Sequence, residues 1–184
     1  SQSSVLTQTV NPAPPNISLT PSASPSVFGQ PVTFTATITP VESTRAPTGT
    51  VTFYDGTTAI GTVACPSILF GAVSVPLTIG TLSVGSHSIS AACSGDSNYT
   101  SATSNTVNLT VNKASTNTAL ASSVNPSALC QSVTFTATVT AASPGGGTPT
   151  GTVTFKQGGT ALGTGTLSGG TAIYSTSSLA QGSD

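Results

Sequence analysis

The sequence predicts an all-β protein made of tandem β-sandwiches, the second of which is incomplete within this chain. A strand signature occurs twice, as PVTFTATIT at 31–39 and SVTFTATVT at 132–140, so two copies of one domain follow each other. Within each signature Thr alternates strictly with apolar residues, which is the period of a half-buried strand. Short alternating runs separated by Gly and Pro are typical of a two-sheet sandwich.

The individual strands follow from alternation and from turn residues. Val32, Phe34, Ala36 and Ile38 share the face that we expect to point inward. Asp55-Gly56 is a two-residue hairpin signal, because both central positions of a type I′ turn need positive φ. No segment has helical periodicity of useful length. The first copy is expected to form strands near 16–20, 31–39, 49–54, 57–63, 72–79, 86–93 and 104–111, and the second near 117–121, 132–140, 151–156, 159–165 and 171–177.

Alignment of the copies shows that the chain is out of phase with its own repeat. PTGTVTF occurs at 47–53 and again at 149–155, and the first copy carries a small insertion within 63–80. Asp184 aligns with His87, so the second copy lacks the equivalents of the last two strands. Residues 3–11 align with 104–112, the last strand of the first copy. The expected organisation is an orphan last strand at 1–12, a complete domain at 13–112 and a domain lacking its last two strands at 113–184.

Composition limits the classes of partner. Charged residues make up 4% of the 184 residues and the net charge is −1, which argues against nucleic acid and against an anionic membrane surface. No apolar stretch is long enough to span a membrane, so no membrane insertion is expected. The chain opens without a signal-peptide pattern, so we expect either that a signal peptide was removed or that the chain is internal to a longer one. A nearly uncharged, β-rich surface needs its sheet edges covered.

Four segments together resemble the bacterial immunoglobulin-like repeat family of long surface and secreted proteins. The segments are SPSVFGQPVTFTATITP, PTGTVTFYDGTTAIGT, LSVGSHSIS and SGDSNYTSATSNTVNLTV, and the match covers nearly the whole chain in two copies. The resemblance implies tandem immunoglobulin-like (Ig-like) β-sandwiches that serve as a stalk, spacer or adhesive module outside the cell. It implies no enzymatic activity and no cofactor.

The cysteines depart from this family pattern. Cys65 lies in the insertion, and Cys93 stands where similar repeats usually carry an aromatic residue before SGDSNY. Given the extracellular family, the two are a candidate disulfide, which would contribute roughly 2–4 kcal/mol where the geometry permits; two separate buried thiols are the alternative. Cys130 occupies the place of Gly29 and has no partner in its own copy, so it is a free thiol or bonds a neighbouring chain.

Other motifs give ordinary structural interpretations. Gly95-Asp96-Ser97 superficially resembles a nucleophile motif, but no pattern unites Ser97 with His87, so a turn is expected. One His and scattered carboxylates predict no metal site, with calcium at a domain junction as a weaker alternative. Asn16, Asn98 and Asn108 begin N-glycosylation triplets, and sugars on the many Ser and Thr are an equal alternative.

Two mechanisms would complete the second copy. In one, the chain is a segment of a longer tandem array, and the further sequence of that array supplies the missing strands. In the other, the chain is a fibre subunit that donates a strand to its neighbour, which leaves one strand unaccounted for. Expected partners are therefore copies of itself or adjacent Ig-like domains, with a surface glycan or receptor as a further candidate. The alternative class is a carbohydrate-binding module of a secreted enzyme, with Tyr54, Phe70, Tyr99 and Tyr174 as candidate stacking residues. The candidate donor strand comprises Ser4, Val5, Leu6, Thr7, Gln8, Thr9 and Val10.

Overall fold

The computed structural model describes residues 3–41, 45–180 and 182, and within them the chain is built of strands and loops. The predicted all-β class is therefore confirmed. No helix among these residues is long and apolar enough to cross a membrane. The chain divides into two compact units: unit 1 runs to Asn112 without residues 27–30, and unit 2 holds 27–30 and the chain from Lys113 onward.

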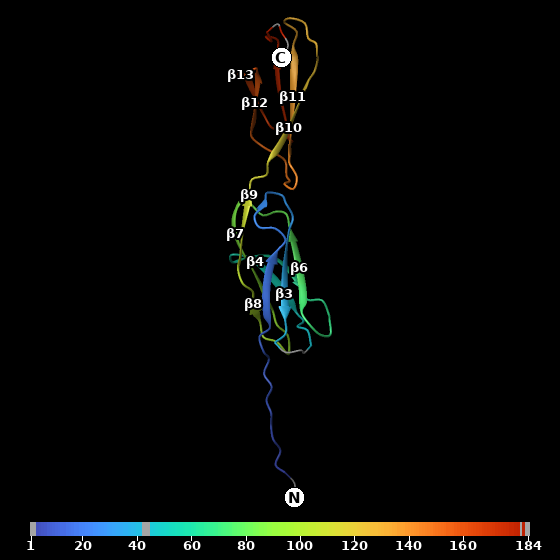
Figure 1. The fold of residues 1–184 in the computed structure, drawn as a ribbon, viewed down its shortest axis with the longest axis vertical. Coiled ribbons are helices and arrows are strands. Elements are labelled where there is room, and N and C mark those ends of the chain that lie inside the picture. Colours follow the sequence, from blue (N-terminus) through green and yellow to red (C-terminus); the bar gives the residue numbers. More distant parts are fainter. Residues whose placement is uncertain (1–2, 42–44, 181, 183–184) are drawn as a thin grey trace. The chain divides into compact units, whose positions relative to one another are not determined.

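Unit 1 is a sandwich of two sheets (Figure 1). The first sheet has the order β1-β3-β6, and both pairings are antiparallel. The second has the order β2-β9-β7-β4-β5, with β8 beside β7. The strands are β1 Asn16–Pro21, β2 Ser26–Val27, β3 Val32–Thr39, β4 Thr50–Asp55, β5 Thr58–Ala64, β6 Val73–Ile79, β7 Gly85–Cys93, β8 Ala102–Thr103 and β9 Val107–Asn112.

The core of unit 1 follows from the alternation in the sequence. In β3 the apolar residues are buried and the intervening Thr residues are partly or fully exposed, as the strand period requires. Phe34, Phe53 and Ile89 are fully buried at the centre of one cluster to which both sheets contribute. Leu109 and Val111 of β9 belong to the same cluster, so the last strand helps to close the core.

Unit 2 repeats the first part of this arrangement. Its strands are β10 Thr116–Ser122, β11 Val133–Ala141, β12 Thr152–Gln157, β13 Thr160–Thr166 and β14 Thr171–Thr176. They form the sheets β10-β11-β14 and β12-β13. The register is the same in both units, since Leu19 is opposite Ala36 and Leu120 is opposite Ala137. The described part of unit 2 contains no counterpart of β7 or β9, and its core cluster is small, with Ala137, Phe155 and Ala172 buried.

The repeated hairpin explains two local sequence features. Each copy has a β-bulge, between Phe53 and Tyr54 in unit 1 and between Phe155 and Lys156 in unit 2. The turn glycine Gly56 has a φ of 58°, in the left-handed region that the Asp-Gly signal predicts. This hairpin pairs β4 with β5, so it positions β4 for contact with β7 on its other side.

Candidate functional site

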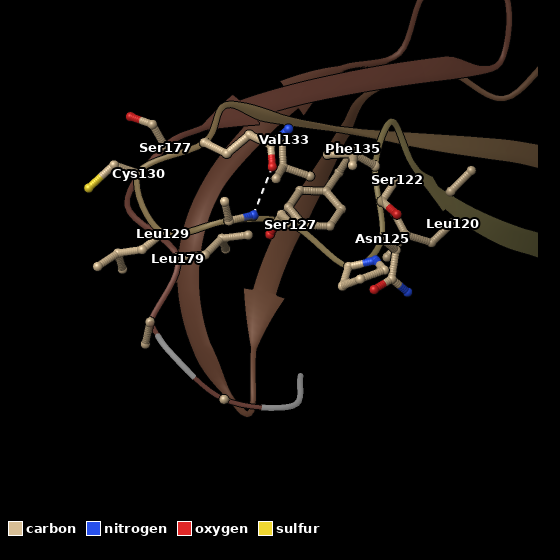
Figure 2. Close-up of a pocket in the computed structure, with 17 residues that line it drawn as sticks. Leu120, Ser122, Asn125, Ser127, Leu129, Cys130, Val133, Phe135, Ser177 and Leu179 are labelled. Carbon is tan, nitrogen blue, oxygen red and sulfur yellow. Dashed lines mark hydrogen bonds between the residues drawn. The ribbon is translucent and has the colours of Figure 1, made fainter.

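The candidate site is an open groove in unit 2, where the described residues provide no counterpart of β7 or β9. It has a volume of ≈ 690 Å³ and is lined by the end of β10, the loop 124–131, the start of β11 and the residues that follow β14. Figure 2 shows Leu120 at one end of the groove and Leu129 and Cys130 near the other. Val133 and Phe135 of β11 also line it. Its wall therefore combines core-facing strand residues, Leu120, Val133 and Phe135, with polar loop residues.

Leu120 shows how far this core is open. Leu19 and Leu120 hold the same position in the two copies, with the same partner residue on the next strand. The exposed fraction of Leu19 is 2%, whereas that of Leu120 is 63%. Identical residues in identical register differ only in what covers them. Leaving an apolar side chain of this size in water forgoes about 1.5–3 kcal/mol of burial energy.

In unit 1 the missing cover is supplied by the last two long strands and the residues before β9. The side chain of Asn105 holds both backbone groups of Leu19: its Oδ1 accepts from the Leu19 N–H at 2.9 Å and its Nδ2 donates to the Leu19 carbonyl at 3.3 Å. Ile89 of β7 and Leu109 of β9 complete the apolar cover in the same core cluster. The groove in unit 2 corresponds to this covered region.

One of these two strands, β7, also pairs with β4 in unit 1. β4 is hydrogen-bonded to β5 on one side and to β7 on the other. Its counterpart β12 pairs with β13, and the described residues provide no strand on its second side. An unpaired row of N–H and C=O groups is a template for another strand. Among the described residues, unit 2 thus presents both a groove that exposes core positions such as Leu120 and an unpaired edge of β12.

The candidate donor strand Ser4–Val10 forms no strand in the structure. Its apolar side chains are almost fully exposed, at 95% for Val5, 89% for Leu6 and 87% for Val10. By the repeat alignment Leu6 and Val10 occupy the places of Val107 and Val111, but Gln8 stands where β9 has the buried Leu109. The pattern matches a last strand at two inward positions and departs from it at the third. Its role as a donor stays a prediction.

The three cysteines are free thiols. Cys93 is buried at the end of β7, and Cys65, one residue beyond β5, packs against the same core cluster. Burial, and after it the charge of Cys93 and a hydrogen bond with it, raise the pKa of Cys65 to about 11. The structure therefore brings the predicted pair together without a bond between them. Cys130 is exposed and has a φ of 64°, the left-handed conformation that its counterpart Gly29 also adopts.

Both ring nitrogens of His87 make hydrogen bonds within unit 1. Its Nδ1 lies 2.6 Å from Asp55 Oδ2, and its Nε2 lies 2.9 Å from the Ser83 carbonyl. The hydrogen bond with Asp55, together with the bond to Ser83, raises the pKa of His87. With both ring nitrogens occupied, His87 is not placed to take a proton from Ser97. Within the described residues, no cluster of three or more His, Cys, Asp or Glu could hold a metal ion.

Asp96 forms the turn that the sequence predicts and a longer-range contact that it does not. Its Oδ1 accepts hydrogen bonds from the backbone N–H groups of Asn98 and Tyr99. Its Oδ2 accepts from the N–H and the hydroxyl of Thr48, at 2.8 and 2.7 Å. Burial alone would raise the pKa of Asp96, but these hydrogen bonds lower it to about 2. Asp96 thus ties the loop before β4 to the loop after β7.

The remaining candidates lie on the surface or in packing positions. Asn16, Asn98 and Asn108 are exposed, as glycan acceptors must be, and their modification stays a prediction. Of the four candidate stacking aromatics, Phe70 is 71% exposed. Tyr99 is buried with its hydroxyl donating to the Arg45 carbonyl, and Tyr174 stacks on Phe155. Tyr54 is partly buried, and a stacking role for these residues stays a prediction.

Strand order and comparison together define the class of protein. In unit 1, β9, β7 and β4 are neighbours in one sheet and β1, β3 and β6 form the other, which is the arrangement of an Ig-like sandwich. The chain is thus a tandem Ig-like protein. The profile of the family described as bacterial Ig-like domain (group 3) matches residues 19–112 and 120–184, and the chain belongs to that family. Domains of this family commonly occur in extracellular and surface proteins. A comparison with curated proteins finds no match.

Proposed function

We propose that this chain is a structural module of an extracellular or cell-surface rod, without enzymatic activity, in which the open unit 2 is completed by two further strands. The observation that carries the proposal is the exposure of Leu120 at 63%, against 2% for Leu19 at the same position of the complete unit. The role of the module is to extend from a surface. Adhesion or filament assembly follows where the strands that complete unit 2 belong to another molecule.

The occupant of the groove is a pair of strands with the pattern of Gly85–Asn112, the last two long strands of unit 1. Unit 1 supports the need for both strands. β7 pairs along β4, and β9, with Asn105 before it, covers Leu19. In strand addition the main-chain hydrogen bonds provide affinity, and pockets for alternate side chains provide specificity. The edge of β12 offers the main-chain hydrogen bonds, and the groove beside Leu120 offers the pockets for side chains.

The segment Ser4–Val10 is the candidate strand that this chain donates. It carries the inward apolar residues of a last strand at Leu6 and Val10. It supplies one strand and not two, so on its own it would leave β12 unpaired. We therefore assign it to completing a repeat that already has its other strands, and we assign the groove of unit 2 to a strand pair.

The test uses the intact chain and a synthetic peptide of residues 85–112 with Ser in place of Cys93. The peptide should bind, and hydrogen exchange should slow at the backbone amides of β12 and β10. Leu120→Asp should abolish both effects. Ile173→Asp is the matched control, because Ile173 is 62% exposed but does not line the groove.

A second measurement identifies the source of the strands. Sedimentation of the chain alone, over a range of concentrations, reports exchange between copies. If association occurs and Leu6→Asp with Val10→Asp removes it, the donor is a second copy and the assignment to a strand pair is wrong. If the peptide leaves exchange at β12 unchanged, the groove does not accept strands and the proposal fails.

A further inference from the structure

Cys65 and Cys93 meet at one end of unit 1, on the core side of the second sheet. Cys93 is opposite Val51 of β4 and is 1% exposed. Cys65 continues the line of β5, where its N–H donates to the Gly49 carbonyl at 2.9 Å. β4 lies between the two strands. The side chains of Cys65 and Cys93 form a hydrogen bond with each other near the beginning of β4. Each thiol contacts the same core cluster.

The second repeat shows that the fold does not require a thiol at this position. Leu167 donates its N–H to the Gly151 carbonyl at 2.9 Å, which is the same contact that Cys65 makes with Gly49. Leu167 also packs against the core cluster of unit 2. A leucine is therefore the apolar residue that fills this place in the other copy. Unit 1 has a thiol there, and it faces a second thiol.

We propose that Cys65 and Cys93 are a disulfide-forming pair that closes when the folded protein meets a disulfide oxidant, such as glutathione disulfide. The Cys65 thiolate attacks the oxidant and releases one of its sulfurs as a thiol, which leaves a mixed disulfide on Cys65. The Cys93 thiolate then attacks the Cys65 sulfur and releases the second thiol. One oxidant disulfide is reduced to two thiols, and the two protein thiols become one disulfide.

The order of these steps follows from exposure. Cys65 is partly exposed, whereas Cys93 is buried, so an oxidant reaches Cys65 first. Burial and the neighbouring thiol raise the pKa of Cys65 to about 11, so little thiolate is present at neutral pH. At pH values below the pKa of Cys65, the rate of oxidation of the folded protein should rise about tenfold for each unit by which the pH increases. The closed bond lies against the core and resists reduction, which suits an oxidising environment outside the cell.

The experiment uses the intact chain with Cys130→Ser, so that the exposed third thiol does not react. Glutathione disulfide should remove the mass of two hydrogen atoms, and peptide mapping should find Cys65 joined to Cys93. With Cys93→Ser, the reaction should stop at a glutathione adduct on Cys65. If both thiols still alkylate after prolonged oxidation, or if Cys65 stops at the adduct when Cys93 is present, the proposal is wrong.

A stability measurement gives an independent readout. The thermal midpoint of unit 1 should rise by roughly 10 °C on oxidation and fall back on reduction. Cys65→Leu is the matched control, since Leu167 shows that leucine fits this position, and it should fold with no redox response. An equal redox response in this variant would overturn the assignment. The outcome is independent of strand addition to unit 2.

Discussion

At the scale of single residues, the pair His87 and Asp55 links the stability of unit 1 to pH. A protonated imidazole donates both of its hydrogen bonds, to Asp55 Oδ2 and to the Ser83 carbonyl. A neutral imidazole has one N–H and must give up one donor. The bond with Asp55, aided by the bond to Ser83, therefore raises the pKa of His87 above its ordinary value of 6.5.

The resulting prediction has a definite sign. Because the folded pKa is above the unfolded one, the stabilisation is fully present below about pH 6.5 and is lost as pH rises through the folded pKa. The thermal midpoint of unit 1 should therefore be higher at pH 6 than at pH 9. His87→Gln should remove this difference. Calorimetry of both proteins across this range is the measurement, and a slope that persists in the variant would contradict the prediction.

Asp96 gives a second residue-scale prediction, with the opposite pH dependence. Hydrogen bonds to a carboxylate are stronger than neutral ones, so Asp96→Asn should destabilise unit 1 by about 1–2 kcal/mol at pH 7. The pKa of Asp96 is lowered to about 2, so its stabilisation is present above about pH 4 and is lost as pH falls towards 2. Urea unfolding should show the wild type and the variant converging over that range. Ser97→Ala, at the exposed neighbour, is the control.

At the scale of elements, alternation and turn residues predicted every long strand to within a few residues. The run 31–39 corresponds to β3 and the run 86–93 to β7. β2 and β8 were not predicted, because strands of two residues carry no periodicity. The expected strand 104–111 begins only at Val107, since Asn105 turns its amide to Leu19 in the other sheet. That contact joins residues far apart in sequence, and local patterns do not encode it.

The candidate site was predictable in part for the same reason. The alignment predicted that unit 2 lacks two strands, and hence that some core would be open. It did not indicate that Leu120 would be 63% exposed, or that Asp96 would bind Thr48. The close approach of Cys65 to Cys93 depends on the order β5-β4-β7 within the sheet, which the repeat pattern alone does not give.

Two glycines provide an element-scale prediction. Gly49 and Gly151 occupy the same place in PTGTVTF and have φ values of 97° and 110°. A Cβ on Gly49 would lie 2.6 Å from the Gly95 carbonyl oxygen and from Ser94 Oγ, whereas at Gly151 nothing lies within 4 Å. Both Ala variants carry backbone strain, but Gly49→Ala also clashes with the loop after β7. It should cost at least about 1 kcal/mol more.

Urea unfolding of the two variants measures this difference. With the peptide of residues 85–112 bound to unit 2, Gly151 should acquire the neighbours that Gly49 has. Gly151→Ala should then weaken peptide binding. Equal costs for the two Ala variants in the free chain would show that the loop after β7 does not constrain this position.

At the scale of the whole molecule, the two units should differ in stability because one has a closed core and the other an open one. Phe34, Phe53 and Ile89 are fully buried in unit 1, whereas in unit 2 the equivalent of Phe34, Phe135, is only partly buried. With charged residues at 4%, little electrostatic repulsion keeps exposed apolar surfaces of different copies apart. The open unit therefore depends on being covered.

Paired leucine variants test this difference. Leu19→Ala empties a closed core and should cost about 2–5 kcal/mol. Leu120→Ala removes a side chain that is already in water, so it should cost less than about 1 kcal/mol. Hydrogen exchange resolves the two units in one sample, and unit 2 should exchange faster throughout. A comparable cost for both substitutions would mean that Leu120 is covered in solution.

The meeting of Cys65 and Cys93 also has a mechanical consequence for a module that carries tension. A disulfide there would enclose β6 and nearly all of β7 in a covalent loop. The 27 residues between the two cysteines would span about 90 Å when stretched. In the oxidised protein that length could not be drawn out, even after every hydrogen bond in the sheets had broken. The redox state of one pair of sulfur atoms would thus set how far unit 1 lengthens before it transmits its load.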